Sequence, residues 1–226
     1  MTLQALHDRL LAWGTAEPRK DRLLDARRAH FGAYGEPHEE DRSYESRING
    51  MLDSYLYDHR AGGAGPTTLE EFLEAEGTSL TAEDRAAFLA LGQNVHALFE
   101  VRRISEGKLR VRDLFTGKDH DVTERRQLVG LEKGDVLEAR LLPFEGQLFF
   151  SGAFLYHPRE ARRAILAEVK RRKKAAGKGG TPDVAGLLAL LSRMAFKLER
   201  YRNVRLESIY DFSPEAVRLA MPAPRG

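Results

Sequence analysis

Residues 95–112 read VHALFEVRRISEGKLRVR, and this stretch decides the fold class of the chain. Apolar residues stand at every second position from Val95 to Val101, and the alternation resumes at Leu109 after the turn-forming run 105–108. A period of two is typical of a strand with one buried face, whereas a helix repeats every 3.6 residues. The stretch therefore predicts two antiparallel strands joined by a tight turn.

Three further strands are predicted downstream, around residue 122, over 136–142 and from 148 to about 156. Turn residues separate them at 116–119, 134–135 and 145–146. Five short strands within about 60 residues are typical of a small antiparallel β-barrel. We therefore expect such a barrel over residues 94–157, with an open, curled sheet covered by the N-terminal helices as the alternative.

Helical periodicity flanks this β region on both sides. Residues 1–60 predict a helical segment, and residues 61–93 predict a glycine-rich flexible linker followed by two short helices. Residues 158–226 predict a basic αα-hairpin, made of helices 158–174 and 182–202, and a C-terminal tail. In the second helix, apolar residues from Val184 to Tyr201 recur at spacings of three and four, which is typical of a helix–helix seam. We expect this seam to pack on helix 158–174, although it could pack on a second copy of itself. The predicted class is α+β.

The composition is that of a globular protein, with 226 residues, 42% hydrophobic, 31% charged and no cysteine. The lack of cysteine excludes disulfides, thiolate catalysis and Cys-based zinc sites. No apolar run approaches the roughly 20 residues of a membrane span, and the first residues read as a helix, not a signal peptide. We therefore expect a cytoplasmic protein that does not contact a membrane. No catalytic residue, metal ligand or cofactor is predicted, and only a pocket gathering Asp113, His120 and Glu138 would point to an enzyme.

Two segments of the β region carry a resemblance. Residues 112–117 read RDLFTG and residues 131–141 read LEKGDVLEARL. Together they resemble a β segment of uncharacterised bacterial proteins, some of which carry a C-terminal SEC-C zinc-binding motif. The resemblance covers about residues 95–157 and implies a small β unit. The zinc motif does not carry over, because this chain has no cysteine.

Charge is unevenly distributed along the chain. Residues 1–100 contain 10 Lys and Arg against 18 Asp and Glu, whereas residues 101–226 contain 26 (36 − 10) against 16 (34 − 18). Such a basic half indicates a patch for nucleic acid or another polyanion, or a surface on which an acidic segment docks.

The basic residues gather into stripes on the predicted elements. At about 100° per residue, six cations of helix 158–174 fall within an arc of about 120°. They are Arg159, Arg162, Arg163, Lys170, Lys173 and Lys174. The next helix carries a shorter stripe of Arg193, Lys197 and Arg200, and strand parity places Arg102, Arg110, Arg112 and Arg140 on the outside of the barrel. Such stripes neutralise a phosphate backbone without reading base identity.

We therefore predict a non-enzymatic protein that binds RNA or DNA through backbone contacts. Helix 158–174 and its neighbour would supply most of the affinity, and the strand arginines would continue the track. The alternative is an adaptor or assembly protein whose acidic and basic halves bind protein partners or each other, including a second copy of the chain. The sequence does not distinguish RNA from DNA, nor does it show whether the acidic half covers the basic one.

Overall fold

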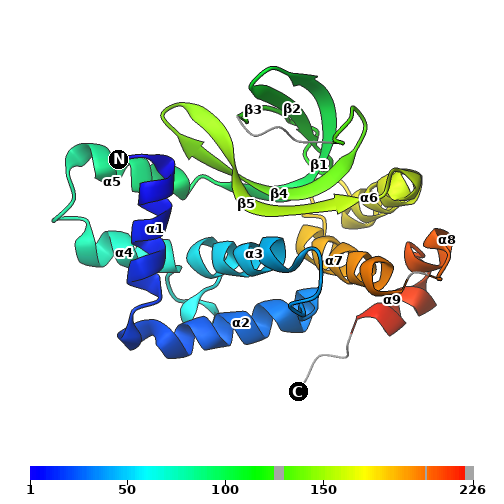
Figure 1. Ribbon diagram of the computed structural model, residues 1–226, viewed down its shortest axis with the longest axis horizontal. Helices are drawn as coiled ribbons and strands as arrows, with labels where there is room; N and C mark the ends of the chain where they lie inside the picture. The colour runs from blue at the N-terminus through cyan, green and yellow to red at the C-terminus, as the bar shows by residue number, and fades with distance from the viewer. Residues whose placement is uncertain (125–129, 202, 222–226) are drawn as a thin grey trace.

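The computed structural model describes residues 1–124, 130–201 and 203–221, and within them five strands close into a barrel (Figure 1). The strands are β1 (Val95–Ser105), β2 (Lys108–Asp113), β3 (Asp119–Thr123), β4 (Val136–Phe144) and β5 (Gln147–His157). Their order around the ring is β1-β2-β3-β5-β4. The α+β class and the barrel are confirmed, and the open sheet is not formed.

One strand pair runs parallel, which the sequence did not predict. In this pair Val122 of β3 lies opposite Leu148 of β5, while the other four pairs among the described residues are antiparallel. The reason is geometric: strand directions can alternate all the way around a ring only when the number of strands is even. A closed ring of five strands therefore contains at least one parallel pair.

The barrel interior is mainly apolar, and the outer faces of β1 and β4 are largely covered as well. Phe99, Val111 and Leu137 are fully buried inside the barrel, while every residue of β4 from Val136 to Leu142 is buried. Strand parity predicted that Arg140 lies on the outer face of the barrel, exposed to solvent. Its side chain does point out of the barrel, but it is only 2% exposed, because helices cover this part of the wall.

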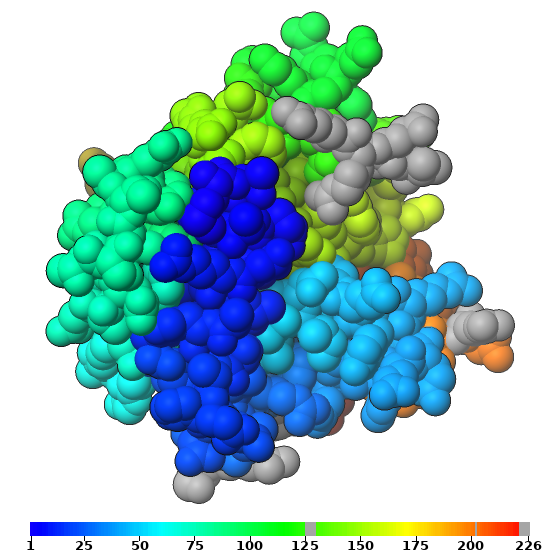
Figure 2. Space-filling model, turned by 60° about the vertical axis from the view of Figure 1, so that its left-hand side comes forward, coloured from blue at the N-terminus to red at the C-terminus, as the bar shows by residue number. Residues whose placement is uncertain are grey.

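Five N-terminal helices form that cover. They are α1 (Leu3–Gly14), α2 (Lys20–Tyr34), α3 (Tyr44–Tyr57), α4 (Thr68–Glu76) and α5 (Ala82–Leu91). Thr2, Thr67 and Thr81 cap three of these helices by accepting backbone N–H groups of the first turn, as their positions predict. Figure 2 shows the helices as a continuous layer beneath the barrel. The layer has its own core, which Leu142 of β4 joins.

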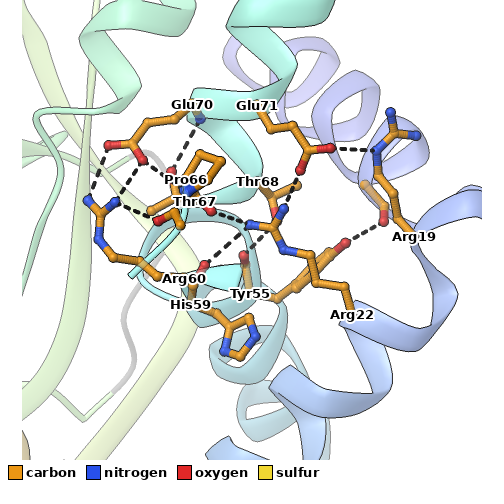
Figure 3. Close-up of polar contacts among 12 residues, drawn as sticks. Arg19, Arg22, Tyr55, His59, Arg60, Pro66, Thr67, Thr68, Glu70 and Glu71 are labelled. Carbon is orange, nitrogen blue, oxygen red and sulfur yellow. Dashed lines mark hydrogen bonds and ion pairs between the residues drawn. The ribbon is translucent and has the colours of Figure 1, made fainter. Parts of the chain in front are cut away.

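The linker after α3 is held in place, although its glycines predict a flexible segment. Arg22 of α2 donates hydrogen bonds to the carbonyl oxygens of His59 and Pro66 and pairs with Glu71 (Figure 3). Arg60 forms a two-pronged contact with Glu70 at 3.0 and 3.2 Å. These side chains occupy the backbone acceptors that the linker exposes, so they fix the start of α4 against α2.

The C-terminal helices follow β5. A 3₁₀ turn (η3, Arg159–Ala161) leads into α6 (Arg162–Ala176), and α7 (Val184–Arg200), α8 (Leu206–Ile209) and α9 (Pro214–Ala220) come next. The seam of α7 packs inside the chain, since Leu187 and Leu191 share a core with Ile165 of α6 and Leu98 of β1. None of the helices in the described ranges is long and apolar enough to cross a membrane.

Candidate functional site

Three of the predicted cations converge where the start of α6 meets the rim of the barrel. Arg102, Arg159 and Arg162 line a groove of about 350 Å³ together with Lys133. Two buried carboxylates, Glu100 and Asp135, also line it. We call this site, formed by these six residues, the basic groove.

Glu100 of β1 fixes two of the arginines. Arg102 Nη1 donates to Glu100 Oε2 at 2.6 Å, and Arg162 Nε donates to Glu100 Oε1 at 3.1 Å. Burial raises the pKa of the Glu100 carboxyl, but the hydrogen bonds and charges of Arg162 and Arg102 outweigh burial and lower this pKa below its ordinary value. Glu100 is therefore ionised at neutral pH and holds both guanidinium groups at the barrel rim.

The turn 132–135 positions the third arginine. Gly134 has a φ of 93°, a conformation that favours glycine, and its N–H donates to the Val101 carbonyl at 2.8 Å. The turn thereby attaches to β1 and presents Asp135, whose Oδ1 accepts from Arg159 Nε at 2.6 Å. Burial raises the pKa of Asp135, but the hydrogen bonds from Arg159 and from the Glu132 N–H produce a net lowering.

The basic groove carries an excess of positive charge. Four cations and two carboxylates line it, which leaves +2 (4 − 2), and Glu132 at 2.8 Å from Arg159 reduces the excess to +1. A guanidinium group has five N–H donors, so an arginine bound to a carboxylate keeps donors for a second acceptor. The groove can therefore receive a phosphate oxygen without losing its internal ion pairs.

The outer face of α6 extends this charge. Four exposed cations lie on this face, and none of their side chains forms an ion pair or a hydrogen bond with another residue in the described ranges. We call Arg163, Lys170, Lys173 and Lys174 the α6 face. The opposite side of the helix is apolar, with Ile165 and Val169 in the core, so the helix is fixed with its cations directed outward.

Two arginines that the sequence analysis left out, Arg171 and Arg172, share one buried counter-ion on α6. Arg171 Nε and Arg172 Nε donate to the carboxylate of Glu168 at 2.6 and 2.8 Å, and Glu168 is only 3% exposed. Arg172 also reaches Asp183 Oδ2 at 2.7 Å, which ties α6 to the start of α7. The cationic helix thus contains its own counter-ion, on the side away from the α6 face.

The strand arginines are neutralised by neighbouring carboxylates. Arg110 Nε lies 2.7 Å from Asp121 Oδ1, and Arg112 Nε lies 2.7 Å from Asp119 Oδ1, each within a two-pronged pair between β2 and β3. The charges of these four side chains cancel, so Arg110 and Arg112 add little to a track of positive charge.

Two of the three cations in the α7 stripe bind other parts of the chain. Arg193 donates to the carbonyl oxygens of Gly32 and Ala33 at the end of α2, both at 2.6 Å. Arg200 donates to Asp41, and this hydrogen bond is the main reason that the pKa of Asp41 is lowered to about 2. Lys197 is exposed but lines a separate groove beside α8 and α9. The stripe therefore does not continue the α6 face.

The three residues that would have pointed to an enzyme do not come together. Asp113 lies opposite Phe99 and His120 opposite Val111, on the inward side of the wall, whereas Glu138 lies opposite Leu98 on the outward side. Asp113 instead shapes a turn by accepting the N–H of Phe115 at 2.8 Å. Among the described residues, no group of three His, Asp or Glu side chains could hold a metal ion.

Comparison with known proteins gives a family but no activity. No curated protein and no solved structure matches the chain. A family model described as "Family of unknown function (DUF7986)" matches residues 20–183, which run from α2 through the barrel and α6 to the start of α7. Because the match spans well over half of the sequence and includes the basic groove and the α6 face, the chain belongs to this family of unknown function.

Proposed function

We propose that this protein binds nucleic acid through its phosphate backbone, along the α6 face and the basic groove. The observation that carries the proposal is the α6 face itself, where four exposed cations have no acidic partner among the described residues. Binding by such side chains releases counter-ions from the nucleic acid without first breaking an ion pair in the protein.

The groove lies at the N-terminal end of the same helix, so the two surfaces are continuous along α6. Arg162 belongs to the first turn of α6, and Arg159 to the preceding 3₁₀ turn. A backbone following the helix would meet the α6 face first and the basic groove at its end. The five-stranded barrel belongs to the same broad class as the Greek-key barrels that bind oligonucleotides in other proteins, which is support by analogy of fold only.

The binding assay is fluorescence anisotropy with labelled single-stranded RNA, single-stranded DNA and duplex DNA, at about 50 and 200 mM salt. For four phosphate contacts, the affinity should fall about 150-fold for duplex DNA and about 50-fold for single strands between these salt concentrations. The variant R163E/K170E/K174E should abolish most of the binding at low salt.

A matched control separates a local site from net charge. R85E/R205E/R218E makes the same change in charge on exposed arginines outside α6, none of which has an ion pair among the described residues. If both triple variants weaken binding equally, the protein attracts nucleic acid through its net charge and the α6 face is not a site. If the wild type does not bind at about 50 mM salt, the proposal is wrong, and α6 would instead be a surface for an acidic protein partner.

A further inference from the structure

The half of the basic groove next to β1 carries more positive than negative charge. Arg102 and Arg162 bind opposite oxygens of one carboxylate, Glu100, so two guanidinium groups share a single negative charge. Lys133 is exposed in the same groove, and its side chain forms no ion pair or hydrogen bond within the described residues. A Cβ added at Gly134 would lie 3.8 Å from Arg162 Nε, so the turn that carries Lys133 lies against Arg162. We call Glu100, Arg102, Lys133 and Arg162 the Glu100 subsite; its charge is +2 (3 − 1).

The other half of the groove is acidic. Arg159 Nε lies 2.6 Å from Asp135 Oδ1, and Arg159 Nη1 lies 2.8 Å from Glu132 Oε2. One guanidinium group against two carboxylates leaves a charge of −1 (1 − 2). An anion that enters the groove is therefore attracted to the Glu100 subsite and repelled from the half that Arg159 occupies.

The Glu100 subsite also has unused hydrogen-bond donors. A guanidinium group has five N–H donors. Arg102 uses one of them on Glu100, and Arg162 uses two, so four (5 − 1) and three (5 − 2) are not used within the described residues. The ammonium group of Lys133 has three more. Glu100 is only 5% exposed, so it orients the two arginines from beneath and leaves their remaining donors to a ligand.

A β-bulge presents Arg102 at the rim of the barrel. Val101 lies opposite Val111, and Arg103 lies opposite Arg110, which leaves Arg102 as an extra residue in β1. A bulge changes the direction of a side chain, and bulges are over-represented at the rims of barrels and next to active sites. The local backbone is therefore shaped so that Arg102 reaches Glu100 and the groove.

The track of positive charge along α6 ends at this subsite. Arg112 lies directly opposite Glu100 on β2, but Asp119 binds it in a two-pronged pair. The next arginine on β2, Arg110, is bound by Asp121 in the same way. A backbone that follows α6 thus meets cations as far as the Glu100 subsite and neutralised or acidic groups beyond it.

We propose that the Glu100 subsite binds the terminal phosphate monoester of a nucleic acid whose backbone lies along the α6 face. The inference rests on the proposed function and adds which part of the nucleic acid the groove recognises. A monoester carries a charge of about −1.5 to −2 at pH 7 and has three acceptor oxygens, whereas an internal phosphodiester carries −1 and has two free oxygens. The monoester therefore matches the +2 of the subsite, and its three oxygens can accept from Arg102, Lys133 and Arg162.

The test uses the three nucleic acids of the binding assay, single-stranded RNA, single-stranded DNA and duplex DNA, labelled internally. Each is prepared with a 5′-phosphate, with a 3′-phosphate or with hydroxyl groups at every end. A hydrogen bond to a charged group contributes roughly a 10- to 100-fold change in affinity, so one phosphorylated form should bind at least about 10-fold more tightly than the hydroxyl form. The form that binds more tightly shows which end of the strand the subsite holds.

Two variants locate the preference in the subsite. Lys133→Ala removes a side chain that makes no polar contact within the described residues, so it should abolish most of the preference without lowering the thermal unfolding temperature. Arg102→Ala leaves Glu100 bound to Arg162 and should have the same effect on the preference. Arg103→Ala is the matched control, because Arg103 is the next residue of β1 and is exposed but does not line the groove. It should leave the preference unchanged.

The outcomes separate this inference from the proposed function. Lys170→Ala, on the α6 face, should weaken binding of every probe and leave the ratio between phosphorylated and hydroxyl forms unchanged. Equal binding of these forms by the wild type overturns the inference and leaves the proposed function standing. A preference that survives in both Lys133→Ala and Arg102→Ala, or that is lost equally in Arg103→Ala, also overturns the inference. If no probe binds, both proposals are wrong.

Discussion

His157 leads to a prediction about how stability depends on pH. It ends β5, is 5% exposed, and its Nδ1 lies 3.2 Å from the Tyr210 hydroxyl oxygen, while its Nε2 has no hydrogen-bond partner in the described part of the chain. Burial, with a smaller contribution from the charge of Arg47, lowers the pKa of His157 from 6.5 to about 3. The ring is therefore neutral in the folded protein at pH 5 but charged in the unfolded chain.

The sign and size of the effect follow from proton linkage. Because the folded-state pKa lies below the unfolded value, the unfolded chain binds more protons between pH 6.5 and about 3. The free energy of unfolding is therefore fully retained above pH 6.5 and falls as the pH drops through this window. Between pH 7 and pH 5 the loss from one such histidine is about 2 kcal/mol, and any folded-state pKa below about 4 gives the same figure.

The variant His157→Gln tests this, because glutamine keeps a hydrogen-bonding group near Tyr210 but does not titrate. Urea unfolding followed by circular dichroism at pH 7, 6 and 5 should show that the wild type loses about 2 kcal/mol more than the variant over this range. His30, whose pKa is also lowered, to about 4, contributes to both proteins and cancels in the comparison. His38→Gln, at an exposed position, is the control and should behave like the wild type. Parallel curves for the wild type and His157→Gln would refute the reasoning.

Two further predictions concern interactions that hold the helical layer. Arg140→Met should lower the free energy of unfolding by about 3–5 kcal/mol in urea titrations, because Asp53 and Asp58 would lose the cation that compensates them; a loss below about 1 kcal/mol would contradict this. Thr67→Ala should cost about 1 kcal/mol by removing the capping box of α4, and the exposed Thr78→Ala serves as its control, so equal losses in the two variants would exclude the cap as the cause.

Local patterns were sufficient to predict the strands and most helix starts, but not the closure of the barrel. Alternation over 95–112 shows where a strand runs and which side is apolar, and Thr67 followed by Glu70 marks the start of a helix. The parallel contact of Val122 with Leu148 has no local signature, because it joins segments that are not consecutive strands. It follows from the strand count and the closure of the ring.

The charge pattern was predicted better than its neutralisation. Arg110 and Arg112 were correctly placed on the outer surface, and Asp119 and Asp121 have the same alternation on the next strand, so their pairing could have been anticipated from the hairpin. The contact between Arg162 and Glu100 joins residues 62 positions apart and could not. Neutralisation by a partner distant in sequence is therefore the part of the charge pattern that the sequence could not show.

The outward face of β1 shows why the surroundings of its side chains were not visible from the sequence. His96, Leu98 and Glu100 are successive outward residues, paired across the strands with Arg140, Glu138 and Val136. His96 lines a small cavity between the barrel and helices α2, α3 and α7, Leu98 is fully buried in the core shared with α7, and Glu100 lines the basic groove.

At roughly 3.3 Å per residue, the cavity and the groove are therefore only about 13 Å apart along a single strand. Strand parity alone predicts that all three outward side chains of β1 face solvent. The N-terminal helices cover one end of this row and leave the other beside α6, so a single alternating pattern contributes both to a cavity under the helices and to the basic groove. Leu98 stands between the two with no polar side-chain atom, so no polar side chain on this face of β1 connects the cavity with the groove.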